Sequence, residues 1–106
     1  MDPNEVNARL DQVQLVDVRD PAEWRAGRIP GARWIRMDEL PDRLGELDAD
    51  RPVVTVCRSG KRSGKVAEFL TSRGYHADNL DGGMQAWARA GLPVRTPQDE
   101  RPGTVA

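Results

Sequence analysis

The chain of 106 residues contains few reactive or aromatic side chains: one cysteine, one histidine, one tyrosine and one phenylalanine. A single cysteine excludes a disulfide within the chain. With only one histidine beside it, a structural zinc site of the usual Cys/His kind is not expected either, and no metal or cofactor is predicted. If the cysteine has a function, it therefore works as a free thiol, and any second thiol must come from a partner.

The sequence also lacks an excess of charge and any long apolar run. Sixteen basic and seventeen acidic residues leave a net charge of -1, which argues against a nucleic-acid or membrane-surface binder. No segment approaches the roughly 18 apolar residues of a membrane span. The first residues also lack the basic and then apolar pattern of a secretory signal. We expect a cytoplasmic protein with neither nucleic-acid nor membrane partners.

Segments typical of strands and helices alternate along the chain. The clearest strand is residues 52–57, a continuous apolar run typical of a parallel sheet, and shorter strands are predicted at residues 13–18 and 76–80. Helices are predicted after the capping box of Asp2 and Glu5, over residues 38–47, from the loop after residue 57 to Gly74, and around Met84 and Trp87, whereas residues 20–24 and 29–32 are interpreted as turns. The pattern predicts one α/β domain over residues 1–94, with a mostly parallel central sheet flanked by helices on both faces. Residues 95–106 are predicted to form a poorly ordered tail.

The one cysteine, Cys57, ends the clearest strand and is followed by the small and cationic residues RSGKRSG. Ligands of α/β sheets bind beyond the carboxyl ends of the strands. Small residues let successive backbone N–H groups converge on one point, and the next helix adds the partial positive charge of its N-terminus. A free thiol has a pKa of about 8.5, and comparable settings lower it to roughly 3.5–7.5. We therefore predict a nucleophilic thiolate, open to solvent, in a cradle that attracts anions.

The alternative is that Cys57 is a buried core residue, because free cysteine is among the most buried residue types. A core position would not be followed at once by Arg58, Lys61 and Arg62. Their charges oppose the dipole of a helix N-terminus unless an anion is bound there. The sequence therefore favours a functional thiol.

This loop is similar to the active-site loop of the rhodanese family of sulfurtransferases, which often has the sequence Cys-Arg-Ser-Gly-x-Arg, as residues 57–62 do. Two further segments resemble family signatures, LVDVRDPAEWRAGRIPGA at residues 15–32 and LDGGMQAW at residues 80–87, the second followed by GLPV. The resemblance covers almost everything from Val13 to Val94. Three such segments in the same order make the resemblance specific, and it implies the rhodanese-like α/β fold.

The resemblance implies an enzyme, a sulfurtransferase of the thiosulfate type. Cys57 would attack the outer sulfur of thiosulfate, release sulfite and carry a persulfide until cyanide or a thiol removes the sulfur. The implied substrate-binding residues are those of the loop: Arg58, Ser59, Gly60, Lys61, Arg62 and Ser63. The expected partners are a small anionic sulfur donor and a thiol or cyanide acceptor, with a protein donor or acceptor as the alternative.

Other functions stay open at the level of sequence. Cysteine phosphatases of the same fold separate the cysteine and the arginine by five residues, whereas four separate Cys57 from Arg62. The shorter loop suits a sulfur atom better than a phosphoryl group, and arsenate reduction is disfavoured for the same reason. A non-catalytic regulatory binding module would generally lack the cysteine. A carrier that takes sulfur from a protein persulfide has the same sequence features as a thiosulfate enzyme.

The charged residues of the first signature receive structural predictions. Asp17 ends a strand and is interpreted as an exposed acid, with a side chain facing the site as the alternative. Arg19 and Glu23 are expected to form a surface ion pair that pins the turn. Arg28 stands where the family usually has histidine, in a turn expected to lie away from the cysteine.

The tryptophans and the histidine are also assigned structural roles. Trp24, Trp34 and Trp87 are expected to pack in the core or in turns and not to form a binding platform. His76 lies at the start of a predicted strand, and no general base is needed where the loop already supplies a thiolate.

Overall fold

A parallel sheet forms the centre of the molecule. The computed structural model describes residues 1–96, and its four strands lie in the order β2-β1-β3-β4, with every neighbouring pair parallel. The strands are β1 (Gln14–Asp17), β2 (Arg33–Trp34), β3 (Val53–Val56) and β4 (Ala77–Asn79). The predicted α/β class with a mostly parallel sheet is confirmed.

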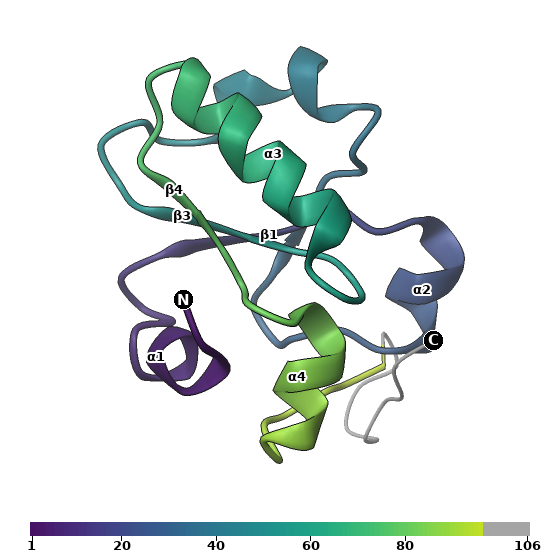
Figure 1. Cartoon of the computed structure of the whole chain (residues 1–106). Helices are drawn as coiled ribbons and strands as arrows, with labels where there is room; N and C mark the ends of the chain where they lie inside the picture. The colour runs from purple at the N-terminus through teal and green to yellow at the C-terminus, as the bar shows by residue number, and fades with distance from the viewer. Residues whose placement is uncertain (97–106) are drawn as a thin grey trace.

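Helices cover both faces of this sheet (Figure 1). On one face, α1 (Pro3–Ala8) and α4 (Gly83–Arg89) enclose a core that includes Val6, Val54 and Trp87. On the other face, α3 (Lys61–Ser72) encloses a second core that includes Val16, Val53 and Leu70. Successive strand residues point to opposite faces, so the continuous apolar run of β3 supplies both cores.

Two short helices begin at the same sequence pattern. The carboxylates of Asp2 and Asp20 accept the amide of the residue three positions on, Glu5 and Glu23, whose side chains bond back to the cap. Each cap is followed by proline, which suits the first helical turn. The turn predicted at residues 20–24 is wrong, because residues Pro21–Ala26 form the helix α2.

The helix predicted over residues 38–47 is also wrong. The segment forms two single 3₁₀ turns, η1 (Leu40–Asp42) and η2 (Leu44–Glu46). Pro41 and Gly45 interrupt the segment, and both are poor residues for a helix interior. Leu40 and Leu47 are buried nonetheless. The leucine spacing therefore correctly indicates a buried segment, but it does not indicate an α-helix.

At the C-terminal end of the described residues, Arg95 exchanges two backbone hydrogen bonds with Arg28. Residues 97–106, most of the predicted tail, lie outside the described residues. Across residues 1–96, no helix is both long enough and apolar enough to cross a bilayer.

Candidate functional site

Cys57 comes directly after β3, at the carboxyl edge of the sheet. Strand alternation places its side chain with that of Val53 on the α3 face, where it packs in the same core as Val66. The side chain is 0% exposed, so the prediction of a sulfur open to solvent is wrong for this conformation. A pocket of about 640 Å³ opens beside Arg62 and Arg36, but Cys57 is not among its lining residues.

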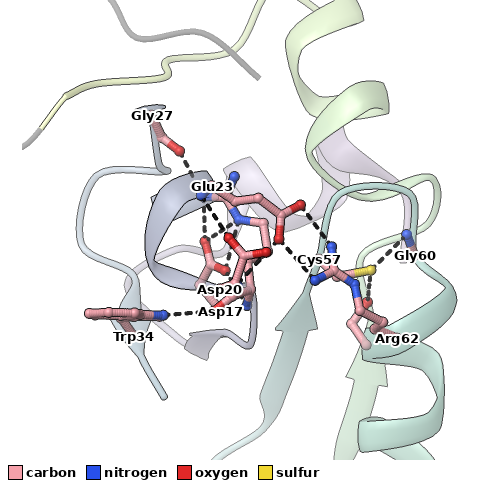
Figure 2. A network of polar contacts seen from close by, with 10 residues as sticks. Asp17, Asp20, Glu23, Gly27, Trp34, Cys57, Gly60 and Arg62 are labelled. Atoms are coloured by element: carbon pink, nitrogen blue, oxygen red, sulfur yellow. Dashed lines mark hydrogen bonds and ion pairs between the residues drawn. The ribbon is translucent and has the colours of Figure 1, made fainter. Parts of the chain in front are cut away.

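The buried sulfur is nevertheless surrounded by hydrogen-bond donors (Figure 2). The Gly60 amide donates to Cys57 Sγ at 3.0 Å, and the Ser63 hydroxyl lies 3.3 Å from the same atom. Burial raises the pKa of the Cys57 thiol, but hydrogen bonds to the sulfur together lower it by more, so the pKa lies below its ordinary value. Those donors are the Ser63 hydroxyl and the amides of Ser63, Gly60 and Ser59. The cradle of amides expected from the sequence is present.

The N-terminal turn of α4 fixes the shape of this cradle. The Met84 amide donates to the Cys57 carbonyl at 2.8 Å, and the Gln85 amide donates to the Arg58 carbonyl at 3.0 Å. In a trans peptide the N–H points away from the C=O, so the amides that follow these carbonyls are directed away from α4. Gly83 permits the close approach, because a Cβ there would overlap both carbonyl oxygens. Gly83 of the C-terminal signature thus shapes the cysteine loop.

Asn79, at the end of β4, also holds the loop, although no feature of the sequence indicates it as a site residue. Its Nδ2 donates to the Gly60 carbonyl at 3.0 Å, and its Oδ1 lies 2.5 Å from the Ser63 hydroxyl oxygen. Both partners come from the segment that contains Cys57. Parallel pairing of β3 with β4 brings Asn79 here, a contact between distant segments that no local pattern signals.

Arg62 is tied to α2. Its guanidinium donates two hydrogen bonds, of 2.9 and 2.8 Å, to the Glu23 carboxylate (Figure 2). Burial raises the pKa of Glu23, but the bond from Arg62 and the capping amide interaction with Asp20 lower it overall. The negative charge of a Cys57 thiolate also contributes to raising the Arg62 pKa, after the larger effect of Glu23. Arg62 therefore places a fixed positive charge near the sulfur.

The predicted Arg19–Glu23 surface pair is wrong. Arg19 binds Asp17 instead, with Nη2 at 2.8 Å from the carboxylate, and both side chains are buried. The prediction that Asp17 is exposed is therefore wrong too. Asp17 shares the sheet face of Leu15, the face opposite to Cys57, so it does not face the sulfur. The pair instead binds the turn after α2, because Arg19 also donates to the Gly27 carbonyl.

The aromatic residues have the packing roles predicted for them. Trp24 and Trp34 stack with ring centroids 5.5 Å apart, and the Arg28 guanidinium lies over the Trp24 ring at 4.3 Å. Trp87 is fully buried and donates to the Pro93 carbonyl. His76 precedes β4 at the amino edge of the sheet, whereas Cys57 lies at the carboxyl edge.

The loop residues selected from the sequence divide into two groups. Gly60 and Ser63 contact the sulfur, and Arg62 lies close enough for its charge to act on it. The side chains of Arg58, Ser59 and Lys61 are exposed on the outer side of the loop.

Comparisons with known proteins identify the family of the chain. The model of the Rhodanese-like domain matches residues 2–90. A "Sulfurtransferase" of Allochromatium vinosum is 46% identical over 92 residues, 86% of each chain. The crystal structure of a rhodanese-like domain protein from Staphylococcus aureus is 36% identical, with a TM-score of 0.78 over 94% of each chain. A thiosulfate sulfurtransferase structure from Pseudomonas aeruginosa is 27% identical, with a TM-score of 0.78 over 91% of this chain and 19% of that one. With a buried, amide-lined cysteine at the carboxyl edge of its parallel sheet, the chain belongs to the rhodanese-like domain family.

Proposed function

We propose that this rhodanese-like protein moves a sulfane sulfur from a small anionic donor, of which thiosulfate is the simplest, to a thiophilic acceptor through a persulfide on Cys57. The observation that carries the proposal is the set of donors around Cys57 Sγ, which stabilises negative charge on that one atom. Similar proteins described as a sulfurtransferase and as a thiosulfate sulfurtransferase support the reaction class and the donor.

The reaction has two balanced steps. The Cys57 thiolate attacks the outer sulfur of thiosulfate, the S–S bond of thiosulfate breaks, and sulfite leaves with the electron pair. The persulfide that remains has one negative charge on its outer sulfur. Cyanide or a thiolate then attacks that outer sulfur, and the Cys57 thiolate is regenerated as the leaving group. One cysteine is sufficient for this cycle, and two-step kinetics of the ping-pong type are expected.

The loop supplies the electrostatics of both steps. The amides of the cradle stabilise the thiolate and then the persulfide anion. The same fixed donors serve both forms, so the protein does not have to reorganise between the two steps. Arg58 and Lys61 stand exposed on the outer side of the loop, and they would attract the dianionic donor. Arg62, held by Glu23, contributes its charge from a fixed position.

Burial of the sulfur sets a condition on this mechanism. Because Cys57 is 0% exposed, a donor reaches Sγ only when the loop moves outward. The contacts that such a movement would break are the bond from the Gly60 amide to Sγ and the bond from Asn79 to the Gly60 carbonyl. A thiol that must stay reduced between turnovers suits a reducing compartment, so we place the protein in the cytoplasm.

The test is the intact mass of the protein after incubation with thiosulfate. We expect a gain of one sulfur atom with release of one sulfite, loss of the adduct on adding cyanide, and no adduct in Cys57→Ser. An adduct formed only from a protein persulfide would replace the small donor by a carrier function. No adduct from any donor would reject the proposal in favour of a binding module, and hydrolysis of an aryl phosphate without sulfur transfer would reject it in favour of a phosphatase.

A further inference from the structure

A connected group of side chains from β3, α3 and β4 surrounds the inner side of the cysteine loop. Ser63 Oγ lies 3.3 Å from Cys57 Sγ and 2.5 Å from Asn79 Oδ1. Thr55 Oγ1 donates to the Ser63 carbonyl at 2.8 Å and lies 3.4 Å from Asn79 Oδ1. Thr55 and Ser63 are fully buried and Asn79 is partly buried, so little water is available to any of these groups.

The orientation of the Asn79 amide is fixed by Gly60. Nδ2 donates to the Gly60 carbonyl, and a reversed amide would place two oxygens against each other there. Oδ1 therefore faces the Ser63 hydroxyl. Two oxygens 2.5 Å apart need a proton between them, and the Ser63 hydroxyl is the donor of the pair.

One hydroxyl proton thus has two acceptors. A serine hydroxyl donates a single hydrogen bond, so Ser63 donates either to Asn79 Oδ1 or to the Cys57 sulfur, but not to both. When Ser63 donates to Asn79, the 3.3 Å contact with the sulfur is satisfied only by an S–H that donates to Ser63 Oγ. That arrangement belongs to the protonated thiol. When the sulfur is an anion, it needs the Ser63 proton itself.

We propose that Asn79 is a positioning residue of the sulfur site, because its side-chain oxygen competes with the Cys57 sulfur for the one hydroxyl proton of Ser63. The inference rests on the proposed function only in treating Cys57 as the reacting group. In the thiolate form, the Ser63 hydroxyl turns to the sulfur, and Thr55 Oγ1 gives up its bond to the Ser63 carbonyl and becomes the donor to Asn79 Oδ1. The charge on the sulfur is thereby coupled to the hydrogen bonding of β4.

The charged groups around Cys57 also influence its pKa, so a test of Asn79 must leave them unchanged. The cations are Lys61, Arg62 and Lys65 on α3 and Arg58 in the loop, and the acid is Glu23 on α2, which is paired with Arg62. Asp17 of β1 and Asp78 of β4 lie on the opposite sheet face. Asn79 is uncharged. Its replacement by another uncharged residue leaves every one of these charges in place, so a changed titration of Cys57 reports the hydrogen bonds.

The experiment is a titration of Cys57 by the absorbance of the thiolate, which needs no reagent to reach the buried sulfur. The chain has one cysteine, so Cys57→Ser serves as the blank. We expect Asn79→Ala to lower the pKa of Cys57 by about 0.5–1 unit, because Ser63 is then free to donate to the anion. Asn79→Leu, which keeps the volume without a polar atom, is expected to do the same. A residue that only braced the loop would instead raise the pKa when lost.

Three further variants complete the test. Ser63→Ala is expected to raise the pKa, and Asn79→Ala in the Ser63→Ala background is expected to change nothing more, because no proton is left to compete for. Thr55→Val removes the substitute donor and is expected to raise the pKa. An Asn79 variant with a raised or unchanged pKa, or a shift that persists without Ser63, overturns the inference. The titration is independent of sulfur transfer, so a wild-type protein that takes up no sulfur rejects the proposed function and leaves this result standing.

Discussion

At the scale of single residues, the sulfur site depends on which atoms can approach the loop closely. Two carbonyls of the loop, those of Cys57 and Arg58, accept amides of α4, and Gly83 lies directly against both. The sequence indicated Cys57 because its own neighbours are unusual. It could not indicate Gly83 or Asn79 as site residues, because their contacts with the loop arise from packing over more than fifteen positions of sequence.

Gly83→Ala is expected to lower both stability and sulfur transfer. The added Cβ would overlap the carbonyl oxygens of Cys57 and Arg58, which belong to the backbone and cannot turn aside as a side chain could. The residue also has a φ of +59°, which a side chain disfavours. We expect the free energy of unfolding to fall by roughly 3 kcal/mol, measured by urea denaturation. The rate of sulfur-adduct formation in the folded fraction should fall more than tenfold.

Gly91→Ala is the matched control for that substitution. Gly91 has a φ of +76°, but a Cβ there meets no atom within 4 Å. Its substitution therefore has only the backbone cost, about 1 kcal/mol, with sulfur transfer at the wild-type rate. Equal losses of stability in the two variants would show that the contact between Gly83 and the loop is not important.

At the scale of elements, α2 connects the first signature to the cysteine loop. β1 and β3 are adjacent and parallel, with Asp17 opposite Val56, so the segments that follow them meet at one edge of the sheet. The capping box of α2 orients Glu23 so that its carboxylate receives Arg62. The sequence contains that box in the same form as at Asp2, and α2 was missed because six residues show too little periodicity to distinguish a helix from a turn.

The paired charges predict a pH-dependent role for Glu23. Glu23→Gln keeps an oxygen for the capping box but removes the charge that binds Arg62. We expect a loss of about 1 kcal/mol of unfolding free energy at neutral pH, a moderate value because the Arg62 side chain is 40% exposed. The pKa of Glu23 is lowered from 4.5 in the folded protein. The stabilisation is therefore present above pH 4.5 and is lost as the pH falls through the folded-state pKa.

Urea denaturation of wild type and Glu23→Gln between pH 3 and pH 7 measures this difference. The two stability curves should converge at the acid end, where Glu23 is protonated in both states. The control is Glu46→Gln: Glu46 lies on η2 and pairs with Arg43, both side chains are more than a third exposed, and the substitution should change the free energy of unfolding less than Glu23→Gln does. A difference between wild type and Glu23→Gln that is independent of pH would mean that packing, and not charge, fixes α2.

At the scale of the whole molecule, an almost neutral protein has a positive segment around its sulfur. The net charge is -1, yet residues 51–67 contain no acidic side chain. All of the acidic residues lie elsewhere on the chain, and Glu23, which reaches the loop, is bound by Arg62. Composition alone shows only that the chain as a whole is almost neutral. The local positive field can be predicted only from the order of the residues, because it arises from four cations close to the end of one strand.

This field predicts that an anionic donor reacts faster at low ionic strength. Charges more than about 10 Å apart are screened at 0.1 M salt, and attraction toward a cationic loop acts over such distances. We expect kcat/KM for thiosulfate to fall roughly three- to tenfold between about 20 mM and 500 mM salt. Lys61, exposed in the loop, should account for part of this dependence, so Lys61→Gln should react more slowly at low salt and depend less on salt. Arg9→Gln, at the end of α1 and far from the loop in sequence, makes the same change of net charge and should leave both quantities at their wild-type values. If the two variants lose rate equally, the molecule attracts its donor through total charge, and the arrangement of cations around Cys57 has no part in capture.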